Sequence, residues 1–319
     1  MKRRAFCLAT ATLFAFSLAS VAHAGLFRAY LSLNGSDTNP CTRPQPCRLL
    51  PAALAAVNDG GEIWILDSAN FNTATVTIAK SVSILAVPGA LGSIAANGSA
   101  AMSINAPTSK VALRNIKFAP VSGSGGGNGI EVTSVGHLGI EESVFENLNE
   151  AVTMSGAANM SIRGSVFRTN LVGLDVGQTG GASQSITIDH ASYVENATSI
   201  RVLTNSTSGG IRVSIDNSEI RGGGGGNGTV SFGGGVASAA PINASIMRTK
   251  IAGNGSGVGV SAFGAQTLVA IGECHISGWP LGGTRTLNGP SGVGILQSLG
   301  NNFYFDTAFD NISNTISPR

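Results

Sequence analysis

Apolar residues recur along the chain in a fixed template. In each copy an apolar residue is followed two positions later by an Ile-like residue and, five positions after that, by Phe, Tyr or Ile. The copies end at Phe118, Phe145, Phe167, Tyr193, Ile220, Ile251 and Ile276. Repeats of about 22 to 31 residues are too short to enclose a core of their own, so the copies must stack on one another.

A second, alternating pattern precedes most copies of the template. Pairs such as Ile130/Val132 and Leu174/Val176 place apolar residues two positions apart, the period of a strand with one buried face. No helical period runs through this region, and turns rich in Gly, Asn and Ser separate the short strands. The sequence predicts an all-β fold, a single-stranded right-handed parallel β-helix whose apolar columns form internal ladders with about 4.8 Å between coils.

Both ends of such a stack need covers, because a terminal coil exposes strand edges and core. Residues 47–58 read as a short amphipathic helix, which we expect to cap the first coil within an N-terminal segment, residues 25–61. The β-helix itself is expected over residues 62–300. Residues 301–319 begin with a concentration of Phe and Tyr and are predicted to form a C-terminal cap.

Residues 1–24 have the features of a secretory signal peptide. Three basic residues at positions 2–4 precede an apolar stretch that ends in Ala22-His23-Ala24, a small-x-small cleavage motif. Cleavage before Gly25 predicts a secreted protein, extracellular or periplasmic, with no transmembrane anchor after signal cleavage.

Composition and charge exclude several classes of protein. The chain has 319 residues, of which 11% are charged, and its 44 Gly show no three-residue period, so neither a coiled coil nor a collagen-like chain fits. Of the 19 Lys and Arg, three lie in the signal peptide, which leaves 16 against 17 Asp and Glu in the mature chain. A net charge near −1 gives no electrostatic case for nucleic acid as a partner.

Cysteine usage fits an oxidising compartment. Cys41 and Cys47 flank a short loop that contains two prolines, and we expect a disulfide between them. Cys274 lies in a column of small residues of the template and is expected to be a buried, inert thiol. Trp64 is interpreted as core of the first coil, and Trp279 as a loop residue able to stack on a sugar.

Several Asn residues follow the aromatic position of the template by two or three residues. Because Asn tolerates the left-handed backbone that tight corners need, we expect a structural role for them. They are Asn147, Asn170, Asn196 and Asn254.

Taken together, these features resemble those of secreted bacterial right-handed parallel β-helix repeat proteins of the pectin-lyase-like superfamily. The likeness rests on the repeats and on four segments: Gly35 to Cys41, Pro46-Cys47, Gly60 to Ile63 and Lys80 to Ile84. The superfamily hosts lyases, hydrolases, tailspikes and adhesins, so the resemblance implies a fold more than a function. The Asn-Thr-Asp, Asp-Asp, Gly-His-Gly and Arg-Ile-Lys segments of polygalacturonase-type hydrolases do not occur in this sequence.

Pectate-lyase-like enzymes use Asp and Glu clusters for calcium and an Arg or Lys as base, and one outward column offers such groups. Asp189 and Asp216 occupy equivalent positions in successive copies and could share a calcium ion, with Asn217 as a further oxygen ligand. Arg163 and His190 would flank them as proton-transfer groups. The alternative is an exposed ladder of charges of alternating sign that only solvates one edge of the solenoid.

A neighbouring outward column contains only small residues and predicts a flat, uncharged face. It comprises Ala112, Gly139, Ser161, Thr187, Ser214, Ser245 and Ala270. Such a face suits a long polymer, so we expect a non-catalytic surface- or glycan-interacting scaffold without a cofactor. Its partner would be a polysaccharide or a cell-surface component. Two alternatives stay open: a calcium-dependent polysaccharide lyase or related glycan-active enzyme centred on Arg163, Asp189 and Asp216, and a structural cell-envelope or matrix protein.

Overall fold

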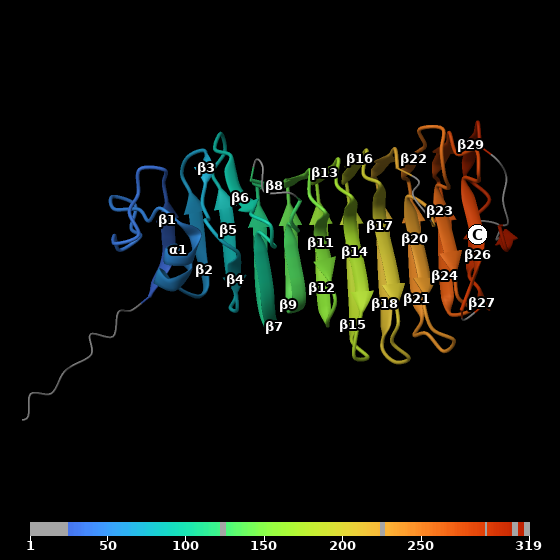
Figure 1. Ribbon diagram of the computed structural model, residues 1–319, viewed down its shortest axis with the longest axis horizontal. Coiled ribbons are helices and arrows are strands. Elements are labelled where there is room, and N and C mark those ends of the chain that lie inside the picture. Colours follow the sequence, from blue (N-terminus) through green and yellow to red (C-terminus); the bar gives the residue numbers. More distant parts are fainter. Residues whose placement is uncertain (1–24, 122–125, 224–226, 291, 308–311, 316–319) are drawn as a thin grey trace, which may run out of the picture.

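The computed structural model describes residues 25–121, 126–223, 227–290, 292–307 and 312–315. The chain winds into an elongated stack of coils that runs from β1 and α1 at one end to β29 at the other (Figure 1). Within the described residues the strands pair in parallel, apart from the two pairings made by β27. The predicted right-handed parallel β-helix is confirmed as the fold.

Three rows of strands form the walls of the coils. Sheet B is a row of ten strands: β3 Ala69–Asn70, β6 Gly92–Ala96, β8 Ile116–Pro120, β10 Val144–Glu146, β13 Val166–Arg168, β16 Ser192–Val194, β19 Glu219–Arg221, β22 Lys250–Ala252, β25 His275–Ser277 and β29 Phe303–Phe305.

Sheet A contains the other two rows, which β7 Met102–Arg114 and β9 Ile130–Glu141 run through and join. The first row is completed by β4 Val76–Ile78, β11 Glu150–Met154, β14 Val172–Gln178, β17 Thr198–Thr204, β20 Val230–Gly234, β23 Val260–Phe263, β26 Thr284–Gly289 and β27 Gly292–Val293. The second row is completed by β1 Leu26–Leu31, β2 Val57–Ile65, β5 Val82–Ala86, β12 Ala158–Arg163, β15 Ser183–Asp189, β18 Gly210–Asp216, β21 Ile242–Met247, β24 Thr267–Gly272, β28 Ile295–Ser298 and β30 Asn314–Thr315.

The repeated aromatic position forms an internal ladder, as predicted. Phe118, Phe145, Phe167 and Tyr193 are fully buried, with ring centroids 4.7, 4.8 and 4.5 Å apart and nearly parallel planes. Strand pairing then continues the ladder through Ile220, Ile251 and Ile276. The spacing follows from the separation of hydrogen-bonded strands, so stacking of the rings and pairing of the backbone reinforce each other.

Seven corners between the second row and sheet B, from the one before β8 to the one before β25, use one residue in the left-handed region. This corner column reads Asn115, Glu142, Gly164, His190, Asn217, Arg248 and Glu273, with φ between 46° and 59°. Of the Asn residues expected at left-handed corners, Asn147 has that conformation, with φ 58°. Asn170 and Asn196 instead lie buried and form a ladder, in which Asn170 Nδ2 donates to Asn196 Oδ1 at 2.9 Å. Their amides satisfy backbone groups inside the turn, which explains why Asn recurs there.

A short helix and a disulfide loop lie at the N-terminal end. Helix α1, Leu50–Ala56, buries Leu50 and Ala53 against the first coils; its role as a cap stays a prediction. The Cys41–Cys47 disulfide is confirmed. The outer edge of β1 is occupied by this loop, since Tyr30 N donates to Cys41 O at 2.8 Å and Cys47 N donates to Tyr30 O at 2.9 Å. Thus β1 and the first part of β2, within the segment expected to precede the β-helix, already belong to its sheet.

Other sequence predictions fall on the C-terminal coils or outside the described residues. The predicted signal peptide, residues 1–24, lies outside them, as do residues 308–311 and 316–319 of the predicted C-terminal cap. Cys274 is buried, and this burial raises the pKa of its thiol to about 11. The interpretation of Trp279 as a sugar-stacking loop residue is wrong: the ring is fully buried, and Nε1 donates to Ile251 O at 3.3 Å.

Candidate functional site

The structure brings the predicted carboxylates together but gives each of them partners from the protein. Asp189 and Asp216 are directly paired residues of β15 and β18. Asp189 Oδ1 accepts from His190 Nδ1 at 2.8 Å and from Asn217 Nδ2 at 3.1 Å. These bonds, that of His190 first, lower the pKa of Asp189 below its ordinary value. Asp216 forms an ion pair with Arg248.

This outward column has the features of an ion-pair ladder. Arg163 Nε lies 3.8 Å from Asp189 Oδ2 and is largely exposed, and Arg114 pairs with Glu142 at 3.1 Å on an earlier coil. Asn217 turns its amide N–H to Asp189, and its Oδ1 accepts from Arg248 Nε at 3.2 Å, so its oxygen is engaged. Among the described residues no group of three or more His, Cys, Asp or Glu is placed to hold a metal ion. Catalysis and calcium binding here stay predictions.

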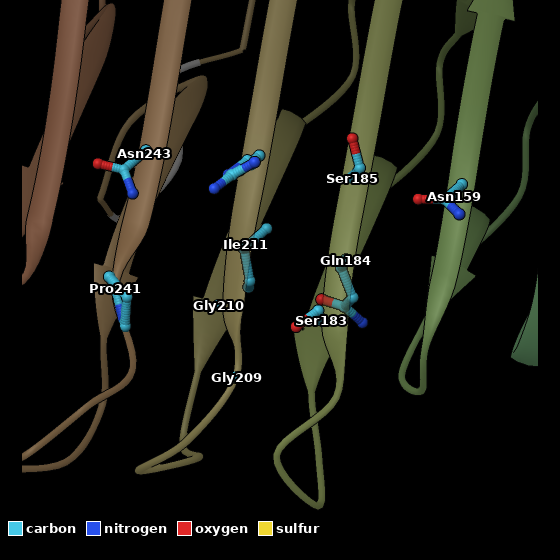
Figure 2. Close-up of a pocket in the computed structure, with 10 residues that line it drawn as sticks. Asn159, Ser183, Gln184, Ser185, Gly209, Gly210, Ile211, Pro241 and Asn243 are labelled. Carbon is cyan, nitrogen blue, oxygen red and sulfur yellow. The ribbon is translucent and has the colours of Figure 1, made fainter.

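A groove lies on the outer face of β12, β15, β18, β21 and β24, which carries the predicted column of small residues. One hollow of about 520 Å³ and a second of about 340 Å³ share Ser185, Arg212 and Asn243 in their lining. Figure 2 shows Asn159 and Ser185 on neighbouring strands, and Asn243 two strands beyond Ser185. Strand pairing places Ser185, Arg212 and Asn243 in one column. Because side chains at Thr187, Ser214 and Ser245 are short, the adjacent column forms a low floor.

One group in this groove has unused hydrogen-bonding capacity. Arg212 is exposed, and its guanidinium forms no ion pair or hydrogen bond with any residue that the structure describes. Gln184 belongs to the inward column of β15 with Ile186 and Ile188. It is 2% exposed, and its Nε2 donates to Gly156 O and Gly177 O inside the solenoid, so it is not a binding group of the outer groove. The residues that line the groove include no Asp, Glu or His.

A second charged cluster, which the sequence analysis missed, lies on the first row of sheet A. Arg201 of β17 bonds Asp175 Oδ2 at 2.6 Å and Glu150 Oε1 at 3.2 Å. Asn128 Nδ2 donates to Glu150 Oε2 at 3.3 Å and to Glu131 Oε1 at 3.0 Å. Partial burial, and then the charge of Asp175, raise the pKa of Glu150. The template did not reveal this cluster, because Glu150 and Arg201 are two coils and 51 positions apart.

Trp64 corrects another expectation. It is only half-buried and lies on the outer face of β2, not in the core of the first coil. The Arg28 guanidinium carbon lies 4.0 Å from the centroid of its ring, and Tyr30 meets it edge-on at 6.4 Å. Glu62 accepts from Arg28 Nε at 2.7 Å and from Trp64 Nε1 at 3.2 Å. The alternation of β2 places Ile63 and Ile65 inside, so Trp64 must face outward.

Comparison with solved structures supports the fold. Pectate lyase Pel9A superposes with a TM-score of 0.53 at 17% identity, covering 91% of this chain and 78% of that one. A lacto-N-biosidase from Eubacterium ramulus gives a TM-score of 0.50 at 10% identity, with 91% and 67% coverage. A rhamnogalacturonan lyase gives 0.46 at 10% identity, with 76% and 81% coverage. The first two likenesses show the fold, a parallel β-helix.

Sequence comparison adds no family. No protein-family model matches the chain. No curated protein matches it at the sequence level. No helix among the described residues is long and apolar enough to cross a membrane.

Proposed function

We propose that the protein is a secreted glycan-binding β-helix protein whose groove on β12 to β24 holds an extended glycan without cleaving it. The observation that carries the proposal is the groove itself, a hollow on the outer face with an available cation at Arg212 and a low floor of small side chains. Sugar hydroxyls both donate and accept, so they match the outward Ser and Asn groups of the lining. The lining contains no Asp or Glu to hold calcium beside Arg212 and no carboxyl or His to act as an acid, so binding without cleavage is the function we propose for it.

Secretion is part of this proposal. It is supported by the signal-peptide features of residues 1–24 and by the Cys41–Cys47 disulfide, which persists in oxidising compartments. The known proteins of similar fold include a pectate lyase and a lacto-N-biosidase, whose names refer to glycans.

Calorimetric titration of the mature chain, Gly25 to Arg319, with neutral and acidic oligosaccharides tests this function. Ser214→Trp places a large ring on the floor of the groove and should abolish binding. Ser192→Trp makes the same change on the outer face of sheet B, in the same part of the solenoid, and should leave binding unchanged. If no glycan binds, or if both variants bind as the wild type does, a structural role toward other proteins would replace this proposal.

A second candidate function has its own observation. Glu150, with a raised pKa beside Asp175 and Arg201, has the character of a proton-donating carboxyl, as in glycan-cleaving enzymes. Assays for new reducing ends and unsaturated ends, with calcium and with a chelator, would detect such an activity. Cleavage lost in Glu150→Gln would assign the reaction to this cluster. Cleavage lost only in Asp189→Ala/Asp216→Ala would assign it instead to the predicted site with Arg163, His190 and Asn217.

A further inference from the structure

The cluster around Trp64 belongs to the same outer face as the groove. Strand pairing connects Trp64 to Leu85 and then to Arg114, and continues through Glu141, Arg163 and Asp189 to Asp216 of β18, the strand that carries Arg212. One continuous row of strands therefore carries a half-exposed aromatic pair at its N-terminal end and the polar groove further along.

The chemistry of this cluster fits a sugar ring. Trp64 and Tyr30 are half-buried aromatic rings on the outside of the solenoid, and the planar guanidinium of Arg28, which lies over one face of the Trp64 ring, adds N–H donors. Glu62 holds both Arg28 and the indole N–H, so the arrangement is fixed before any ligand arrives. A preorganised aromatic surface loses little conformational entropy on binding.

The distance between the two sites sets the length of ligand that can reach both. From β2 to β18 there are six inter-strand steps, through β5, β7, β9, β12 and β15. At about 4.8 Å a step this is about 29 Å. One sugar of an extended glycan advances by roughly one such step of about 5 Å, so a chain of roughly seven sugars is needed.

We propose that Arg28, Tyr30, Glu62 and Trp64 form a second glycan subsite, and that the protein thereby selects long chains over short ones. The inference rests on the proposed function, since it requires that the groove binds one end of the glycan. Once the groove holds one end of a chain, the aromatic subsite meets the other end at a high effective concentration. A trimer is shorter than the four strand steps, about 19 Å, from β2 to β12, the first strand of the groove, and therefore reaches only one of the two sites.

The two Trp residues of the chain offer a direct test. Trp279 is fully buried and serves as an internal reference, whereas Trp64 is accessible to acrylamide. A long oligosaccharide of a type that binds the groove, ten sugars or more, should protect Trp64 from quenching, and a trimer should not. The long chain should also bind at least tenfold more tightly than the trimer, and Trp64→Ala should abolish this gain while trimer affinity stays unchanged.

A control variant and three outcomes make the test decisive. Phe303→Ala removes an exposed aromatic ring from sheet B and should leave the gain with chain length intact. Unchanged trimer affinity in Trp64→Ala shows that the variant is folded; Tyr30→Ala provides a second variant of the subsite. If long and short chains bind equally, or Trp64 stays accessible in the long complex, the subsite is refuted and the groove is not. If no glycan of any length binds, the proposed function fails and the subsite with it.

Discussion

Arg201 and Arg212 lie in one coil, eleven positions apart, and yet have opposite surroundings. Arg201 of β17 is held between Asp175 and Glu150, with about a third of its side chain exposed. Arg212 of β18 stands exposed at the groove, without an ion pair to any described residue. In the first row of sheet A, Arg201 is thus neutralised by carboxylates of the protein. In the second row, Arg212 has no such partner and is available to a ligand. The difference separates a stabilising ion pair from a binding group.

Of the variants that test this difference, Arg201→Met should have the largest effect on stability. The change leaves Glu150 and Asp175 close together without their shared cation, and it should lower the free energy of unfolding by about 1–2 kcal/mol. Arg212→Met is the matched control in the same coil and should change stability by less than about 0.5 kcal/mol. Urea denaturation of the three proteins measures both. Equal losses in the two variants would contradict the contrast.

Arg212→Ala should weaken glycan binding and leave the stability of the protein unchanged. Loss of one charge-assisted hydrogen bond, worth about 1.5 kcal/mol, corresponds to an affinity for an acidic glycan lowered about tenfold. The melting temperature should stay that of the wild type. Calorimetric titration of Arg212→Ala and Arg201→Met should show the larger loss of affinity in Arg212→Ala. An unaltered affinity in Arg212→Ala would show that Arg212 is not part of the binding site.

Glu150→Gln should change how stability depends on pH. Because the pKa of Glu150 is raised in the folded state, the folded protein holds a proton there that the unfolded chain releases. This residue therefore lowers the free energy of unfolding as pH rises above its ordinary pKa of 4.5. The variant should match the wild type near pH 4.5 and become relatively more stable toward pH 7. Melting curves from pH 4 to 7 measure this; parallel curves would show that Glu150 is not perturbed.

The smallest effect is expected at the ion-pair ladder. Asp189→Asn/Asp216→Asn removes exposed pairs, which should cost less than about 0.5 kcal/mol each. The lowered pKa of Asp189 stabilises the fold above its ordinary pKa of 3.8, and this contribution is lost as pH falls through the lower folded value. Calcium should leave the melting temperature of wild type and variant unchanged. A calcium-dependent rise in the wild type alone would establish the predicted calcium site.

The outward residues show why the site was harder to predict than the fold. The column of small residues from Ala112 to Ala270 could be aligned by the template, and the groove lies over it. Glu150 lies outside that template, and its contact with Arg201 depends on how two intervening loops shift the coils. The two Trp residues were assigned to the wrong environments, because an apolar ring in an irregular coil fits either the core or the outer face.

The sequence by itself determined the β-helix, its internal aromatic ladder, the disulfide and the buried thiol of Cys274. Each depends on which residues recur or lie close in sequence, and a repeat that cannot close its own core has to stack. Only the tertiary structure decided which outward side chains meet. Groups such as Asp175 and Arg201, or Trp64 and Arg28, come from different coils, 26 and 36 positions apart. Their contacts depend on strand register and loop length, which the apolar template leaves unspecified on the solvent side.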